Sequence, residues 1–141
     1  MPLKGRCMCG AVRFTLVEKP KSAGACHCEM CRHWTGGIYV AVEVPSDGLT
    51  LEADDGLRVY TSSPWAERAF CATCGSSLWY RVTADGPYHG RYHLGIGALD
   101  DASGIPVTSE LYIDEKPNGY SFAQKTHQMT AAEVRALFEG G

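Results

Sequence analysis

The chain has 141 residues, of which 45% are hydrophobic and 21% charged, which is ordinary for a globular protein. Its net charge is −3 and its Lys and Arg residues are scattered, so we expect no nucleic-acid partner, because a phosphate backbone requires a basic face. No stretch approaches the roughly 18 apolar residues of a membrane span, and the first residues lack the apolar run of a signal peptide. We therefore expect one cytoplasmic domain over residues 1–141, without membrane contact.

Sixteen glycines and seven prolines predict many turns and hence short strands. Apolar residues alternate in segments rich in β-branched and aromatic residues, which favours a mainly β fold with antiparallel pairing. In chain order, the expected strands are Ala11–Leu16, Ile38–Val44, Thr50–Glu52, Leu57–Tyr60, Glu67–Phe70, Leu78–Val82, Tyr92–Ile96 and Glu110–Ile113.

Two helical segments are expected. A short helical turn over residues 32–35 follows the central cysteines. Near the C-terminus, Thr130 and Glu133 have the spacing of a capping box, and Gly140 can end the helix that follows. The apolar face of this helix comprises Val134, Leu137 and Phe138, which predicts a packing role.

Seven cysteines fall in three tight clusters, and their odd number excludes complete intramolecular pairing. A reducing compartment also disfavours structural disulfides, so thiolate–metal ligation is the better interpretation. The clusters are Cys7-x-Cys9, Cys26-His27-Cys28-x-x-Cys31 and Cys71-x-x-Cys74.

Seven ligands divide into four and three, which matches one closed zinc site and one zinc site that keeps a position for substrate. Residues i and i+2 of an extended backbone point the same way, and a C-x-x-C turn presents two sulfurs together. Spacing alone does not fix the division. Cys26 and Cys28 could instead join Cys71 and Cys74, a single zinc could leave spare thiols, and an iron–sulfur cluster would also take four cysteines.

The central cluster supplies three sulfurs from one loop. Its candidates for a fourth protein ligand are His27, His33, His89 and His93. His27 stands between two cysteines, so its ring is expected to point away from an ion that they share. For His27 and His33 a supporting role beside the metal is the simpler interpretation.

Three motifs together resemble the GFA family, the glutathione-dependent formaldehyde-activating enzymes, which also includes centromere protein V. They are Gly5-x-Cys7-x-Cys9-Gly10-x-Val12-x-Phe14, Cys26-His27-Cys28-x-x-Cys31-Arg32-x-x-x-Gly36, and Arg68-x-Phe70-Cys71-x-x-Cys74-Gly75-Ser76-x-Leu78. The resemblance covers nearly the whole chain and includes all seven cysteines in order.

This resemblance implies a β-tent of two antiparallel sheets with cysteine loops and a short C-terminal helix. It implies two zinc ions, with Cys7, Cys9, Cys71 and Cys74 as structural ligands and Cys26, Cys28 and Cys31 as catalytic ligands. It also implies a small-molecule thiol partner, glutathione, and a carbon–sulfur lyase reaction in which formaldehyde and glutathione form S-hydroxymethylglutathione.

Arg32, next to the catalytic cluster, is a candidate to bind a substrate carboxylate. Trp34, Trp65, Phe70 and Trp79 are candidate pocket walls, although aromatic residues in a small β protein more often belong to the core. Many relatives carry a histidine in the late strand and a tryptophan in the next loop; residues 110–114 and 116–120 differ here, and we expect them to shape the substrate region.

The sequence thus supports three hypotheses. The first is a zinc-dependent enzyme that makes or breaks a C–S bond. The second is a zinc-stabilised binding module without turnover, and the third is a redox-responsive protein whose thiolates release zinc on oxidation. Three cysteines with a position for substrate favour the first and the third, since stability alone would be served by the closed site.

Overall fold

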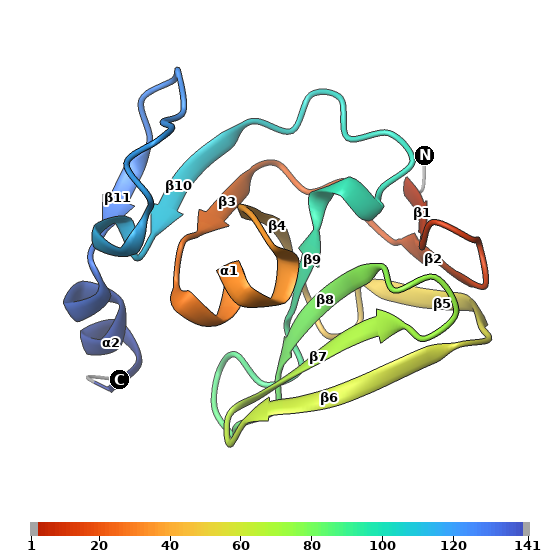
Figure 1. The fold of residues 1–141 in the computed structure, drawn as a ribbon. Helices are drawn as coiled ribbons and strands as arrows, with labels where there is room; N and C mark the ends of the chain where they lie inside the picture. The colour runs from red at the N-terminus through yellow and green to blue at the C-terminus, as the bar shows by residue number, and fades with distance from the viewer. Residues whose placement is uncertain (1–2, 140–141) are drawn as a thin grey trace.

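The computed structural model describes residues 3–139, which form two β-sheets, two α-helices and two short 3-10 helices (Figure 1). The mainly β fold with a short C-terminal helix is confirmed. The elements are β1 (Leu3–Arg6), β2 (Val12–Leu16), β3 (Ala23–Cys26), α1 (Glu29–Thr35), β4 (Tyr39–Val44), β5 (Leu49–Asp54), β6 (Leu57–Ser63), β7 (Ala66–Cys71), β8 (Ser77–Val82), β9 (Tyr92–Gly95), η1 (Ile96–Ala98), β10 (Val107–Leu111), η2 (Ile113–Glu115), β11 (His127–Met129) and α2 (Ala131–Glu139).

The smaller sheet has the order β1-β2-β5 and the larger one β11-β10-β3-β4-β9-β8-β7-β6. All pairings in the smaller sheet are antiparallel, as expected. In the larger sheet β10 pairs in parallel with β3 and with β11, which departs from the antiparallel expectation. Alternation of apolar residues reports which face of a strand is buried, and it carries no information on strand direction.

The two sheets meet through aromatic side chains. Phe14 of β2 lies edge-on to Trp79 of β8, with ring centroids 6.1 Å apart, and Trp79 packs in the same way on Tyr92 of β9. Burial alternates along β2 as predicted, with Val12, Phe14 and Leu16 inside. Trp79 is therefore a core residue that holds the sheets together.

Strand β1 contains Lys4 and Gly5, and strand β3 consists of Ala, Gly and Cys; these residue types have a low preference for strands, so neither strand was predicted. Both form because a neighbouring strand comes very close. A Cβ on Gly5 would lie 2.3 Å from the ring of Phe14, and a Cβ on Gly24 would lie 2.6 Å from Ser109 Oγ. Glycine is required at position 5, where a backbone carbonyl is also close, whereas at position 24 the Ser109 hydroxyl would have to rotate away.

Helix α1 begins at Glu29, three residues before the predicted turn, because Cys28 caps its N-terminus, and it ends at Gly36 in the left-handed conformation (φ 76°). The predicted capping box of α2 is confirmed: Glu133 N donates to Thr130 Oγ1 and Thr130 N donates to Glu133 Oε1. The predicted end of this helix at Gly140 lies outside the described residues. Among residues 3–139, no helix combines the length and hydropathy needed to cross a membrane.

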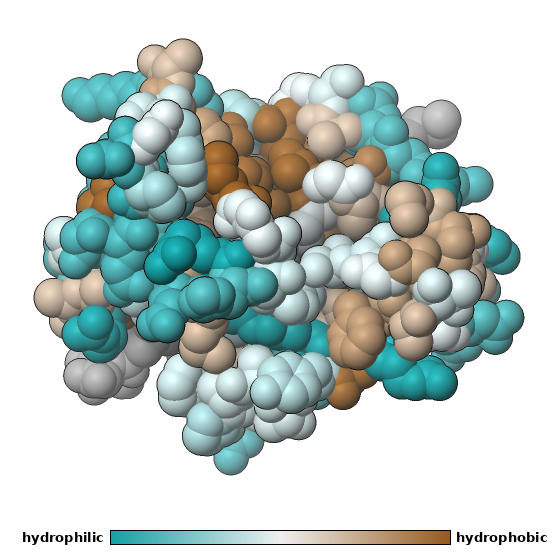
Figure 2. Space-filling model, viewed as in Figure 1, coloured by the Kyte–Doolittle hydropathy of each residue, from teal (hydrophilic) through white to brown (hydrophobic). Residues whose placement is uncertain are grey.

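Polar residues cover much of the face shown in Figure 2, and apolar residues gather toward its upper middle. In the ribbon of Figure 1, seen from the same side, β3 and β10 run through this upper part. Helix α1 lies in front of the larger sheet, beside β3 and β4. The fold therefore places the central cysteine loop, at the junction of β3 and α1, on an accessible side of the sheet.

Candidate functional site

All seven cysteines are free thiols, and their side chains gather in two groups. In the first group, the Sγ atoms of Cys7, Cys9, Cys71 and Cys74 all lie within 4.8 Å of one another. Cys7 Sγ is 3.7 Å from Cys9 Sγ, which is 3.9 Å from Cys71 Sγ. Four sulfurs bound tetrahedrally to zinc at about 2.3 Å are about 3.8 Å apart, so this donor set fits a closed zinc site.

The first group connects the two sheets. Cys7 and Cys9 lie between β1 and β2, whereas Cys71 ends β7 and Cys74 lies in the turn before β8. Gly10 (φ 83°) and Gly75 (φ 80°) adopt left-handed conformations that let each turn fold around its sulfurs. Met8 N donates to Ser76 Oγ between the same two turns, which fixes their relative position.

The second group comprises Cys26, Cys28 and Cys31, whose Sγ atoms also lie within 4.8 Å of one another. Cys26 ends β3, Cys28 is the N-cap of α1 and Cys31 lies in its first turn. Cys31 N donates to Cys28 Sγ at 3.4 Å, so the start of the helix itself orients two of the three sulfurs. Among the described residues, no histidine or carboxylate joins either group.

Without a bound metal ion, the three sulfurs of the second group do not all ionise together, even beside Arg68. Hydrogen bonds from Cys26 and Cys31 lower the pKa of Cys28, and the positive charge of Arg68 acts in the same direction. Hydrogen bonding with Cys28 and Cys31, together with burial, raises the pKa of Cys26 far above its ordinary value. A bound metal ion removes this conflict, because it favours all three thiolates together.

The second group lies in the wall of a cavity of about 430 Å³. Strands of the larger sheet form most of its floor, and charged and aromatic side chains border it. The lining includes Lys21, Cys26, Cys28, Cys31, Glu43, Trp65, Arg68, Tyr80, His93 and Tyr112. A small molecule in this cavity therefore has direct access to the three-cysteine group.

The family model described as glutathione-dependent formaldehyde-activating enzyme, GFA, matches residues 2–115. The chain belongs to the GFA family.

Two relatives match this GFA chain over most of its length. An uncharacterized lyase of Schizosaccharomyces pombe is 32% identical over 134 residues, which cover 93% of each chain. A Halomonas elongata protein, provisionally named as a glutathione-dependent formaldehyde-activating enzyme, is 33% identical over 128 residues, covering 84% of this chain and 79% of its own. A crystal structure of a Rhodobacter sphaeroides protein superposes with a TM-score of 0.56 at 25% identity, covering 74% of this chain and 99% of its own.

The arginine that lines the cavity of this GFA chain is Arg68, whereas the predicted one was Arg32. Arg32 does not line the cavity, and its Nε is buried without a hydrogen-bond partner. Its predicted role in substrate binding stays a prediction. Arg68 lines the cavity instead, and both its Nη atoms lie within 4 Å of Cys31 Sγ. Arg68 belongs to the family motif, but only the fold shows that it turns toward the other cysteine group.

Of the predicted aromatic walls, Trp65 lines the cavity and Trp34, Phe70 and Trp79 do not. Tyr80 and Tyr112 line it as well and were missed. Tyr112 is the one residue other than glycine with positive φ (57°) in the described part of the chain. It lies in the segment that departs from the family pattern, and that departure was the available signal.

Three of the four histidines proposed as fourth ligands have other partners. His27 Nε2 lies 2.8 Å from Glu110 Oε1, His33 pairs with Glu29 on the surface, and His89 Nδ1 contacts backbone carbonyls of residues 83 and 84. His93 lines the cavity, where burial lowers its pKa. His27 is a supporting residue of the cysteine loop, as expected, although its partner Glu110 was not foreseen.

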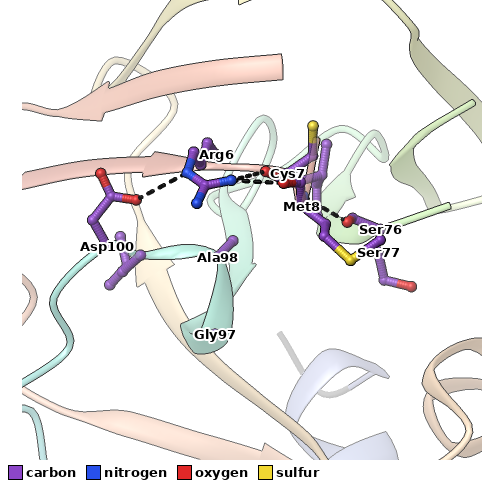
Figure 3. Close-up of a pocket in the computed structure, with 10 residues that line it drawn as sticks. Arg6, Cys7, Met8, Ser76, Ser77, Gly97, Ala98 and Asp100 are labelled. Atoms are coloured by element: carbon purple, nitrogen blue, oxygen red, sulfur yellow. Dashed lines mark hydrogen bonds and ion pairs between the residues drawn. The ribbon is translucent and has the colours of Figure 1, made fainter. Parts of the chain in front are cut away.

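A larger cavity, of about 650 Å³, lies beside the first cysteine group (Figure 3). Arg6 spans it, with its guanidinium bonded to the carbonyls of Cys7 and Met8 and 4.0 Å from Asp100. Of the four cysteines in that group only Cys7 reaches this cavity. Arg6 is thus engaged by other groups of the larger cavity. The smaller cavity is the one lined by three cysteines.

Proposed function

We propose that this chain is a zinc-dependent enzyme of thiol–aldehyde chemistry that makes or breaks the C–S bond of an adduct such as S-hydroxymethylglutathione. One observation carries the proposal: Cys26, Cys28 and Cys31 converge in the wall of a cavity of about 430 Å³. Family membership and the names of the relatives support a lyase that uses glutathione.

Two zinc ions per chain follow from this proposal. Cys7, Cys9, Cys71 and Cys74 would hold a structural ion, since four sulfurs complete a tetrahedral shell. Cys26, Cys28 and Cys31 would hold a catalytic ion and leave one of its positions to substrate. When bound there, zinc supplies a Lewis acid that lowers the pKa of an incoming thiol and keeps its sulfur nucleophilic at neutral pH.

The residues of the cavity have defined tasks in the addition. The substrate thiol loses its proton, its sulfur forms a bond to the aldehyde carbon, and the carbonyl oxygen takes up a proton to become a hydroxyl group. A phenol is protonated at neutral pH, and burial and the charge of Cys28 raise the pKa of Tyr112 further, so its hydroxyl can donate a hydrogen bond to that oxygen. In the reverse direction the same donor holds the departing aldehyde.

The cavity also limits the substrate. Its volume suits a small thiol such as a tripeptide, and its lining includes Lys21, which can meet a carboxylate, and Glu43, which can meet an amine. The thiols of the chain require a reducing compartment, which supports a cytoplasmic location.

NMR exchange spectroscopy of formaldehyde with glutathione, with and without protein, tests this function directly. We expect the purified protein, with close to two zinc ions per chain, to accelerate exchange, and Cys28→Ser to abolish the acceleration. Two bound zinc ions without any acceleration would leave a binding module and contradict the proposed enzyme.

A further inference from the structure

Among residues 3–139, Arg68 is a buried cation without a carboxylate partner. It lies in the middle of β7 and is 4% exposed. Its guanidinium carbon lies 5.0 Å from the ring centroid of Trp34 and 5.0 Å from that of Tyr80. Two aromatic rings thus pack against the guanidinium, which is shielded from water.

The hydrogen bonds of Arg68 identify its counter-ion. Nη1 and Nη2 lie 3.7 and 3.8 Å from Cys31 Sγ. None of the ion pairs between described residues includes Arg68. A buried charge that lacks a partner is costly, so the negative charge that stabilises Arg68 must come from the cysteine group.

The charges then balance. Three thiolates and one divalent cation carry a net charge of −1, which the guanidinium neutralises. The four-cysteine group would carry −2, but Cys9 is exposed there and water can compensate. Cys31 is only 5% exposed, so the three-cysteine group needs a compensating charge from the protein.

The three sulfurs also differ in their hydrogen bonds. Cys31 Sγ receives two N–H groups from Arg68 and Cys28 Sγ receives the amide of Cys31. No N–H group of the described residues reaches Cys26 Sγ within hydrogen-bond distance. Hydrogen bonds withdraw electron density from a thiolate, so Cys31 is the least nucleophilic of the three.

We propose that Arg68 is a positioning residue of the three-cysteine site, which neutralises its excess negative charge and holds Cys31 as a ligand instead of a competing nucleophile. The inference rests on the proposed function, because it assumes that the three cysteines bind a divalent ion. This role would explain why an arginine is buried in strand β7.

Zinc-loaded protein tests this inference without turnover. Competition with a chromophoric chelator measures the zinc affinity of the three-cysteine site. Iodoacetamide labelling, read by mass spectrometry, measures the alkylation rate of each cysteine. For Arg68→Met we expect zinc affinity to fall roughly 10- to 100-fold and Cys31 alkylation to accelerate more than that of Cys26. Arg68→Lys, which keeps the charge, should restore part of both.

Arg81→Met is the matched control, since the Arg81 side chain also stacks on an aromatic ring, that of Tyr92, and donates to Gly90 O instead of to a cysteine. It should change neither readout. If Arg68→Met and Arg68→Lys both keep wild-type affinity and labelling, the role of Arg68 is refuted while the proposed function stands. If the wild-type chain binds only one zinc ion, the inference and the proposed function fall together.

Discussion

His27 Nε2 lies 2.8 Å from Glu110 Oε1, and this pair connects the central cysteine loop to β10 in the interior of the protein. Thr126 and Gln128 donate to the other carboxylate oxygen. The backbone reinforces the connection, because His27 N donates to Leu111 O at 3.0 Å. The residue between two metal-ligand candidates is thus fixed by a strand more than 80 positions away in sequence.

Glu110→Gln should loosen this connection. The variant keeps the shape of the side chain but removes its charge, so we expect a loss of about 1–3 kcal/mol in unfolding free energy, measured by urea denaturation. Glu52→Gln is the control, because Glu52 accepts a hydrogen bond from Thr15 on the surface and should cost less than about 0.5 kcal/mol. Equal effects of the two substitutions would show that burial of the pair is unimportant.

The same carboxylate predicts a pH dependence. Burial alone would raise the pKa of Glu110, but hydrogen bonds from Thr126, His27 and Gln128 outweigh it and lower the pKa below 4.5. A carboxyl group with a lowered native pKa stabilises the fold fully above its unfolded pKa and loses this contribution as the pH falls through the native one. The stability difference between wild type and Glu110→Gln should therefore be constant above about pH 5.5 and shrink below about pH 4.5. A difference that grows on acidification would reverse the sign of the shift.

The two cysteine groups should respond differently to substitution. Cys74→Ser removes a ligand from the group that connects the sheets, so we expect severe destabilisation, roughly 3 kcal/mol or more. Cys28→Ser should leave a folded chain with one zinc ion and no activity. Thermal unfolding and elemental analysis check both variants. Identical behaviour would contradict the division into structural and catalytic ions.

Tyr112→Phe removes the proposed hydrogen-bond donor and little else. We expect kcat to fall by roughly 10- to 100-fold with little change in the KM for the thiol, because the bond strengthens as charge develops on oxygen. Tyr60→Phe, on the exposed strand β6, is the control. Steady-state kinetics that show only a raised KM would assign Tyr112 to substrate binding.

Gly5→Ala should be destabilising, because its Cβ would lie 2.5 Å from the carbonyl of Ala98 as well as against the ring of Phe14. We expect a loss of about 1–3 kcal/mol. Gly97→Ala is matched to it, since a Cβ there meets nothing within 4 Å. Calorimetry should separate the two variants, and a stable Gly5→Ala would mean that β1 can move away from β2.

Sequence reasoning succeeded where local pattern and covalent spacing decide. The alternation of Val12, Phe14 and Leu16 predicted a half-buried strand, and the cysteine spacing with the family resemblance predicted the four-and-three grouping that the structure shows. It failed where distant segments decide. Neither Arg68 facing Cys31 nor Glu110 facing His27 leaves a local signature, because β7 and β10 are brought to the cysteine loop only by the sheet. The parallel pairing of β10 with β3 and β11 was not predicted for the same reason.

Strand β7 ends in Cys71 and carries Arg68 three residues earlier, so one strand reaches both cysteine groups. An ion bound by the first cysteine group would fix the end of β7 and thereby hold the Arg68 guanidinium beside the second group. Occupancy should consequently be sequential: in a stepwise titration of the metal-free chain, the second equivalent of zinc should bind only after the first has ordered β7.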